Sequence, residues 1–357
     1  MANFVEKENI FLRIAKYLIP WKGDRPGEII RKIIFIAAAA TLVVTLVMLT
    51  SNELHRAADA KDNEELSEIY HGTATKVDIN TESREELQKE YPSVQEQFLP
   101  LLEINKDVIG WITVGDSSYI DYVVMQGKDN SYYLTHNYKG EESRSGALFV
   151  DYHDPITAEK QPANIVVYGH NMESGEYFGK LPYYFNYGFS TNNPEDISFY
   201  KKYPTITFST LYKTSTYKIF GGILVNTEEE AGSVFKYHMK RNFKDKADFD
   251  SFCAEILDRS TFINPDVNLK YGDNLLTLST CMFGYGDADL RWVIFARETR
   301  EGESPEVDVS KAYANPSPKF YDLYYDIFGG KWLGGNKIPD SWQGRGWKED
   351  IIVDFRQ

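Results

Sequence analysis

The stretch LLTLSTC, residues 275–281, alternates leucines with small polar residues, and a second strand-like stretch, LRWVIFA, follows at 290–296. Successive side chains of a β-strand point to opposite faces, so Leu276 and Leu278 share one face while Cys281 lies on the other. The pattern predicts a strand that turns its leucines toward a core and ends on a thiol outside that core.

The second stretch fits the first as an antiparallel partner. If Cys281 lies opposite Arg291, then Leu278 meets Ile294 on the leucine face. The thiol and the guanidinium then lie side by side on the other face. The register that pairs the apolar residues therefore predicts an arginine next to the cysteine.

Further strand-like segments precede this pair, separated by turns of Gly, Asn, Asp and Pro. They lie at 109–114, 121–125, 147–151, 164–168, 205–209 and 215–225. The 25 Tyr and 21 Phe of the chain also favour strands. With no βα alternation and no internal repeat, about eight short strands predict a mainly β fold, a closed or nearly closed barrel.

Two helices accompany the strands. Residues 93–96 read Ser-Val-Gln-Glu, a capping-box pattern at the start of a short apolar-periodic segment, which predicts a helix before the first strand. A second helix is predicted at 247–258. Its apolar stripe consists of Phe249, Phe252, Cys253, Ile256 and Leu257.

Composition excludes several classes of protein. The chain has 357 residues and a formal net charge of −14, which argues against a nucleic-acid binder, since binding phosphates needs a basic face. Two cysteines cannot form a disulfide scaffold or a four-cysteine zinc site. The acidic run Glu228-Glu229-Glu230 is better read as a solvated loop than as a calcium site. We expect no metal and no cofactor.

One segment is apolar enough to cross a bilayer. Residues 33–50 carry no charge, and at roughly 1.5 Å per residue such a helix spans about 27 Å. Residues 1–32 hold 7 Lys and Arg against 4 Asp and Glu, whereas the rest of the chain holds 32 against 49. The positive-inside rule places the N-terminus in the cytoplasm and the remainder outside. The alternative is a cleaved signal peptide, but the segment after residue 47 offers no clear small-x-small cleavage site.

Cys281 and Arg291 could each be functional residues or ordinary surface residues. A buried inert cysteine would be expected on the leucine face, so a thiol on the polar face at a strand end is a candidate nucleophile. The alternative is a free surface cysteine. Arg291 could stabilise a thiolate or an oxyanion. Its alternative is a surface ion pair with Asp287 or Asp289.

His170 is the candidate base. It follows the apolar strand 165–168 and the turn residue Gly169, and a polar residue at the end of a buried strand is aimed by a rigid element. The alternative is a structural turn histidine held by Asn171. The other histidines lie in stalk, loop or polar helical contexts.

These motifs together resemble those of the sortases. TLSTC at 277–281, Arg291 ten residues later and VVYGHN at 166–171 carry the resemblance. NKDVIGWITV at 105–114, IDYVVMQGKDNSYYL at 120–134 and GALFVDY at 146–152 are similar to class B sortases in particular. The resemblance covers about residues 93–297. Met282 and Phe283 depart from it, because many relatives carry a charged or small residue after the cysteine.

The resemblance implies an eight-stranded barrel with a short N-terminal helix and a helix inserted between strands 6 and 7. It implies a cysteine transpeptidase in which Cys281 is the nucleophile, His170 the acid and base, and Arg291 the oxyanion-stabilising cation. Ser279 and Thr280 are candidate residues of the substrate groove. The implied partners are surface proteins with a C-terminal sorting signal, cleaved after Thr, and an amine of the peptidoglycan precursor.

The expected organisation follows from these readings. It comprises a cytoplasmic segment (1–32), a transmembrane helix (33–50), a stalk (51–92), a sortase-type catalytic domain (93–300) and a C-terminal extension (301–357). The extension begins with a linker-like stretch and could pack on the barrel or contact a partner. Three alternatives to a wall-anchoring transpeptidase remain at this point: a membrane-tethered cysteine peptidase, a sortase that polymerises pilin subunits and a non-catalytic surface scaffold.

Overall fold

The computed structural model describes residues 10–73, 81–116, 119–185, 196–282, 289–328 and 332. The chain divides into two compact units, Met1–Asp59 and Ala60–Gln357. The boundary lies inside the long helix α2, Pro26–Tyr70.

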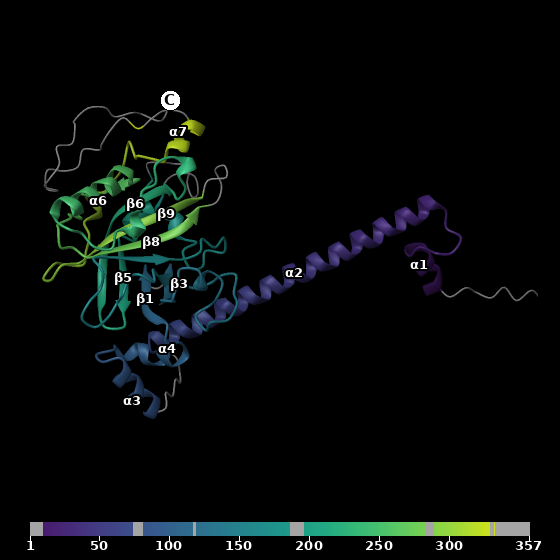
Figure 1. Cartoon of the computed structure of the whole chain (residues 1–357), viewed down its shortest axis with the longest axis horizontal. Coiled ribbons are helices and arrows are strands. Elements are labelled where there is room, and N and C mark those ends of the chain that lie inside the picture. The colour runs from purple at the N-terminus through teal and green to yellow at the C-terminus, as the bar shows by residue number, and fades with distance from the viewer. Residues whose placement is uncertain are drawn as a thin grey trace, which may run out of the picture. The chain divides into compact units, whose positions relative to one another are not determined.

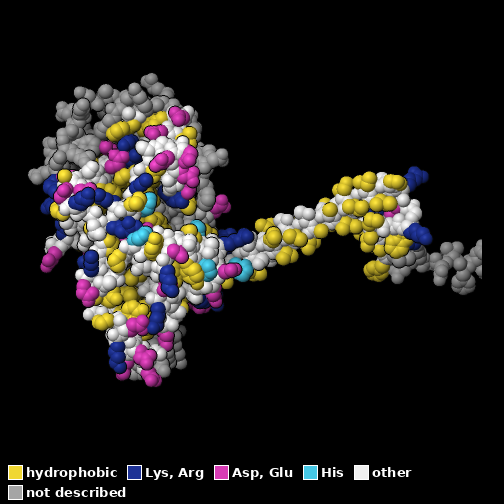
Figure 2. Space-filling model, viewed as in Figure 1, with side chains coloured by type: hydrophobic (Ala, Val, Ile, Leu, Met, Phe, Trp, Pro, Cys, Tyr) yellow, Lys and Arg dark blue, Asp and Glu magenta, His cyan; other side chains and the backbone are white. Residues whose placement is uncertain are grey.

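The N-terminal unit is helical in its described part. Helix α1 spans Ile10–Leu18, and α2 begins at Pro26, a residue whose fixed φ suits the first position of a helix. The side chains of residues 33–49 are largely exposed and hydrophobic, and Figure 2 shows them along α2. Helix α2 is therefore long and apolar enough to cross a membrane.

The second unit is built on a closed barrel of eight strands (Figure 1). Its strands are hydrogen-bonded in the order β1-β2-β3-β4-β8-β9-β6-β5. They span Val108–Val114 (β1), Ile120–Met125 (β2), Leu148–Val150 (β3), Asn164–Tyr168 (β4), Thr205–Thr210 (β5), Thr214–Asn226 (β6), Leu275–Met282 (β8) and Leu290–Glu298 (β9). The expectation of a mainly β, eight-stranded barrel is confirmed.

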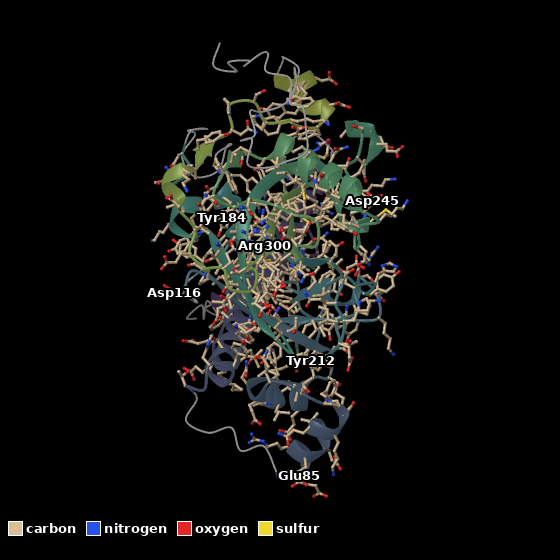
Figure 3. All side chains as sticks on the ribbon, turned by 90° about the vertical axis from the view of Figure 1, so that its left-hand side faces the viewer. Glu85, Asp116, Tyr184, Tyr212, Asp245 and Arg300 are labelled. Carbon is tan, nitrogen blue, oxygen red and sulfur yellow. The ribbon has the colours of Figure 1, made fainter. Side chains whose placement is uncertain are left out.

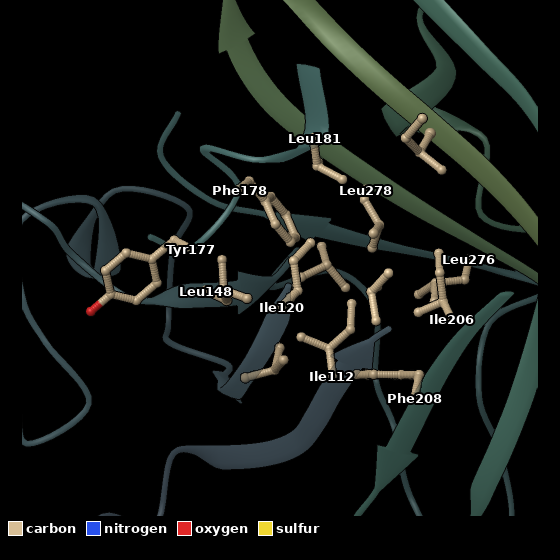
Figure 4. Close-up of a cluster of buried hydrophobic side chains, with 14 of the residues drawn as sticks. Ile112, Ile120, Leu148, Tyr177, Phe178, Leu181, Ile206, Phe208, Leu276 and Leu278 are labelled. Carbon is tan, nitrogen blue, oxygen red and sulfur yellow. The ribbon is translucent and has the colours of Figure 1, made fainter. Parts of the chain in front are cut away.

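The barrel interior confirms the register expected from the leucine pattern. Leu278 lies opposite Ile294 and Cys281 opposite Arg291 in the antiparallel pair of β8 and β9. Leu276 and Leu278 are fully buried, and Figure 4 shows them in one cluster with residues of β1 and β5 such as Ile112. Burial of such side chains stabilises the fold by about 1.5–3 kcal/mol each.

A helix covers part of the outside of the barrel. Helix α6 spans Lys246–Arg259 between the sixth and seventh barrel strands, and it lies beside β6 in Figure 1. Asp245 caps it by accepting a hydrogen bond from the amide of Asp248 at 2.9 Å. Its apolar stripe packs into a second hydrophobic cluster with Val166 and Phe295. The outer faces of β4, β8 and β9 are therefore buried here as well.

The helices before the first strand differ in one detail from the expectation. Helix α3 spans Thr81–Glu90, and a 3-10 turn, Glu96–Phe98, leads into α4, Leu99–Ile104. The capping box expected at 93–96 is wrong. Ser93 has a φ of 66°, and Gln95, which precedes the turn, makes no side-chain capping bond. The short N-terminal helix itself is confirmed.

The end of α2 belongs to the same unit as the barrel. Ser67 donates a hydrogen bond of 2.5 Å to Asp121 of β2, and Trp111 donates one of 2.8 Å to the same carboxylate. Tyr70 stacks on Trp111 at 4.3 Å. The part of the expected stalk from Ala60 to Thr73 is thus helical over most of its length and packed on the barrel.

Short elements complete the unit. They are Tyr132–Leu134 (η2), Leu181–Tyr184 (η3), Ser198–Lys202 (α5), Glu229–Ala231 (η4), Tyr237–Met239 (η5), Phe262–Ile263 (β7), Val309–Lys311 (η6), Tyr313–Ala314 (β10) and Asp322–Phe328 (α7). The described part of the C-terminal extension packs on the domain, since β10 pairs with β7 and Tyr321 is 1% exposed. Arg300, labelled in Figure 3, fixes its beginning with two hydrogen bonds to Asp273 of 2.7 and 2.8 Å.

Candidate active site

Cys281 lies near the end of β8, with its side chain partly exposed. The alternation of the strand directs the leucines inward and the thiol outward. The carbonyl of Cys281 accepts a hydrogen bond of 2.9 Å from the side-chain amide of Asn171. The second cysteine, Cys253, is buried on the inner face of α6. Cys281 is thus the accessible thiol of the described chain.

His170 is placed beside Cys281 by a parallel strand pair. Strand β4 pairs with β8 so that Tyr168 lies opposite Ser279. Two further bonds extend this alignment, one from the Gly169 amide to the Ser279 carbonyl (3.2 Å) and one from the Thr280 hydroxyl to the Gly169 carbonyl (2.8 Å). Continuing the register by two residues brings His170 level with Cys281. The structure therefore brings together the two residues that the sequence singled out 111 positions apart in the chain.

Gly169 lets the chain make this approach. A Cβ atom at this position would lie 2.2 Å from a side-chain carbon of Leu148 and 2.8 Å from one of Phe178. Real Cβ atoms do not come that close, so a side chain here would require Leu148 and Phe178, or the backbone at residue 169, to shift. The glycine is required for close packing and not for a positive φ.

The imidazole of His170 has a defined partner. Its Nε2 lies 2.7 Å from the carbonyl oxygen of Leu134, in the 3-10 turn η2. A carbonyl oxygen only accepts, so Nε2 carries the hydrogen and Nδ1 is the nitrogen that gains or loses a proton. Sequence reasoning missed Leu134, because a backbone acceptor leaves no residue-type signal.

Arg291 lies on the other side of Cys281, directly opposite it in the pair of β8 and β9. Its guanidinium forms a two-pronged ion pair with Asp289, with a second bond of 2.9 Å, and it also donates to the carbonyl of Leu290 at 2.9 Å. Burial opposes the charge, but the bond to Asp289 and the nearby Cys281 thiol raise the pKa of Arg291. The same bond lowers the pKa of Asp289. Arg291 is therefore a permanent cation beside the thiol; Asp287, the other expected partner, lies outside the described residues.

The two candidate groove residues, Ser279 and Thr280, are both 2% exposed. The Ser279 hydroxyl lies 2.7 Å from the hydroxyl of Tyr237, and the Thr280 hydroxyl binds the Gly169 carbonyl. Burial raises the pKa of Tyr237 to about 12, so this phenol stays protonated. Both side chains are satisfied inside the domain, and contact with a substrate stays a prediction.

The remaining histidines lie elsewhere. His71 approaches Asp121 at 3.1 Å, His136 approaches the Tyr132 carbonyl at 2.9 Å, and His153 approaches Asp151 at 2.9 Å. Within the described ranges no group of three or more His, Cys, Asp or Glu side chains could hold a metal ion.

Cysteine, histidine and arginine at the ends of three adjacent strands of a closed barrel define a candidate cysteine acyl-transfer site. The family model described as "Sortase domain" matches residues 116–299. Sortase B of Listeria monocytogenes is 31% identical over 261 residues, which cover 69% of this chain and 90% of that protein. Among solved structures, the substrate complex of Staphylococcus aureus sortase B matches with a TM-score of 0.54 and 26% identity, covering 69% of this chain and 99% of the other.

Sortase B of Bacillus anthracis, solved in complex with AAEK1, matches with a TM-score of 0.52 and 27% identity, over 69% of this chain and 98% of the other. The chain belongs to the sortase family. Its relatives and structural neighbours place it in class B, and it is a sortase transpeptidase of the cell envelope. The expected family, fold and enzyme class are confirmed, and the scaffold alternative falls.

Proposed function

We propose that the protein cleaves a C-terminal sorting signal after a Thr residue and transfers the new carboxyl end to an amine of the cell-wall precursor. Cys281, His170 and Arg291 carry the reaction. The single observation that supports this best is the register of β4, β8 and β9, which aligns the three residues at neighbouring strand ends. The relatives from Listeria monocytogenes and Staphylococcus aureus are sortases B, which agrees with the proposal.

In the first step the Cys281 thiolate, whose proton has passed to Nδ1 of His170, attacks the carbonyl carbon of the Thr residue. The carbon–sulfur bond forms, the carbonyl electrons move to oxygen, and collapse of this intermediate breaks the carbon–nitrogen bond. The departing amine needs a proton, and Nδ1 of His170 in its imidazolium form supplies it. A thioester on Cys281 remains.

In the second step an amine of the wall precursor attacks the thioester carbonyl. Neutral His170 takes the proton that the amine loses, and Cys281 leaves as the thiolate. Arg291 stabilises the negative charge on oxygen in both steps, because a fixed cation beside a developing oxyanion lowers the barrier. Its bond to Asp289 holds the guanidinium in one orientation.

Residues 33–50 anchor the enzyme in the membrane with its catalytic domain outside, as the charge distribution favours. An enzyme so anchored meets secreted proteins and membrane-borne wall precursors at one surface. The thioester gives the amine time to enter in place of water.

The proposal is tested with a panel of sorting-type peptides, each with and without short glycine peptides or diamino acids as acceptors. We expect a subset of peptides to be cleaved after Thr and, with a suitable amine, a ligated product at the expense of hydrolysis. Cleavage that yields only the free acid with every amine would favour the peptidase alternative. Linkage of one substrate protein to a lysine of another copy would favour polymerisation.

A further inference from the structure

The sequence motifs that resemble class B sortases meet at one buried carboxylate. Asp151 follows β3, is 2% exposed and lies in the motif GALFVDY at 146–152. One of its oxygens, Oδ2, accepts a hydrogen bond of 2.9 Å from the side-chain amide of Asn130 and one of 3.1 Å from the hydroxyl of Tyr168. Asn130 and Tyr168 come from the two other motifs nearest the active site. A buried carboxylate with such partners ties three segments together.

Tyr168 and Asn130 lie close in sequence to the two residues that form the hydrogen bond of His170, one to the donor and the other to the acceptor. Tyr168 is the last residue of β4, two positions before His170. Asn130 lies four positions before Leu134, whose carbonyl binds Nε2 of His170. Asp151 therefore holds both the strand that carries the imidazole and the loop that carries its acceptor.

Further hydrogen bonds hold the loop from Asn130 to Leu134. The side-chain oxygen of Asn130 accepts the amide of Tyr152 at 3.0 Å, so both ends of its amide are bound. The carboxylate of Asp129 accepts the amides of Ser131 and Tyr132 at 2.7 and 2.9 Å. These bonds join the segment that carries the Leu134 carbonyl to Asp151 through Asn130.

The second oxygen of Asp151 faces other charged groups. Oδ1 accepts from the backbone amide of His153 at 2.9 Å and lies 2.9 Å from its ring and 3.2 Å from the guanidinium of Arg241. Burial opposes ionisation of Asp151, but its hydrogen bonds from His153 and Asn130 prevail and lower its pKa. Asp151 is thus an anion near neutral pH and accepts hydrogen bonds at both oxygens.

We propose that Asp151 is a positioning residue for His170, which acts by fixing Tyr168 and the Asn130–Leu134 loop relative to one another. It touches no reacting atom. Its effect is to keep the Leu134 carbonyl on Nε2, so that Nδ1 remains the nitrogen that exchanges protons. The expected change in turnover rests on the proposed function. The expected tautomer of the His170 ring does not, because it can be observed in the resting protein.

Asp154 is the matched control. It is also a fully buried carboxylate, and it lies 3.0 Å from the same Arg241. Its other oxygen, however, accepts the amide of Val166 at 3.1 Å, whereas the side chains of Asn130 and Tyr168 donate to Asp151. Asp151→Asn and Asp154→Asn therefore remove the same charge from the same network and each changes an acceptor of β4, but only the first changes the acceptor that joins Tyr168 to Asn130.

The experiment compares full-length wild type, Asp151→Asn, Asp154→Asn and Tyr168→Phe. Long-range nitrogen–proton spectra of histidine-labelled protein report the tautomer of His170, whose signals are assigned from a His170→Ala sample. We expect the Nε2–H form in wild type and Asp154→Asn and a mixture of tautomers in Asp151→Asn.

With a cleaved peptide, Asp151→Asn should lose about ten- to a hundredfold in kcat with KM nearly unchanged, since misplacement of a reacting group costs rate more than binding. Tyr168→Phe should show a smaller effect in the same direction.

A wild-type tautomer and kcat in Asp151→Asn would overturn the proposal. Equal losses in Asp151→Asn and Asp154→Asn, with the tautomer unchanged, would also overturn it, because Asp151 would then act only through the stability of the network. If Asp151→Asn fails to fold, Tyr168→Phe takes its place in the test. A wild-type tautomer of His170 and a wild-type kcat in Tyr168→Phe would then overturn the proposal. If wild type cleaves no peptide, the proposed function fails while the tautomer comparison still tests the role of Asp151.

Discussion

Cys281, His170 and Arg291 are held by the fold in three different ways. Hydrogen bonds from the backbone ladder align Cys281, a loop carbonyl orients His170, and a carboxylate two residues away holds Arg291. In the proposed reaction the thiol and the imidazole exchange protons, whereas the guanidinium keeps its charge and stabilises the oxyanion.

Arg291 is expected to support the transition state and not only the fold. Arg291→Ala removes the cation beside the developing oxyanion, so turnover of a sorting peptide should fall by about 10²–10³. Arg291→Lys keeps the charge but loses the planar two-pronged bond to Asp289 and should recover only part of the rate. Thermal unfolding serves as the control for folding. Near wild-type turnover in Arg291→Ala would remove the residue from the mechanism.

Asp154 makes the stability of the domain depend on pH. Burial, with the charge of Asp151, raises its pKa to about 6, against the pull of the Val166 amide and Arg241. Asp154 therefore binds its proton more tightly in the folded than in the unfolded chain. As pH rises from about 4 to about 6, wild type should lose up to about 3 kcal/mol of stability relative to Asp154→Asn. Urea unfolding of both proteins at several pH values measures this, and a constant difference would contradict it.

The elements packed on the outside of the barrel determine which strand residues are exposed to solvent. The alternation of β8 places Ser279 and Cys281 on the same, outer face of the strand. Helix α6 and the segment around Tyr237 cover that face as far as Ser279, so only Cys281 at its end is partly exposed. Thr277 finds a partner in Asn164 at 2.7 Å. Alternation along a strand gives the face of a residue, but only the elements packed on that face determine its exposure.

Cys253 belongs to this cover and should be structural. It is 4% exposed on α6, among Phe249, Phe252 and Ile256. Cys253→Ala should cost about 1–2 kcal/mol of unfolding free energy, as a small truncation in a packed site does, and leave turnover within a few-fold. Chemical denaturation and peptide turnover check both parts. A Cys253–Cys281 disulfide in the active enzyme, seen in non-reducing mass spectra, would refute the assignment.

The strands and their pairing could be predicted because alternation has a period of two residues, and a shift by one would turn Leu276 and Leu278 out of the core. That register alone placed Arg291 beside Cys281. The capping box at 93–96 failed because a local pattern does not fix the backbone of Ser93, which adopts a positive φ. The Leu134 carbonyl and the Asp151 network could not be predicted, since both depend on loops that meet only in the folded domain.

At the scale of the whole molecule, the charge asymmetry about residues 33–50 makes a prediction on topology. A protease added to intact protoplasts should degrade the part of the chain after residue 51, because the positive segment 1–32 stays in the cytoplasm. A cytoplasmic protein probed in the same sample controls for lysis. Full protection of the C-terminal part in intact protoplasts, with digestion after lysis, would reverse the orientation.

The central claim is that Cys281 carries the acyl group between two amines. The most direct measurement is the intact mass of the enzyme mixed with a cleavable sorting peptide, before and after an amine is added. We predict that wild type gains the mass of the acyl fragment on Cys281, and that the amine removes it as a product heavier by that amine. Cys281→Ala should fold, gain no mass and release no product. Turnover by Cys281→Ala at the wild-type rate, or an adduct that only water releases, would contradict the account.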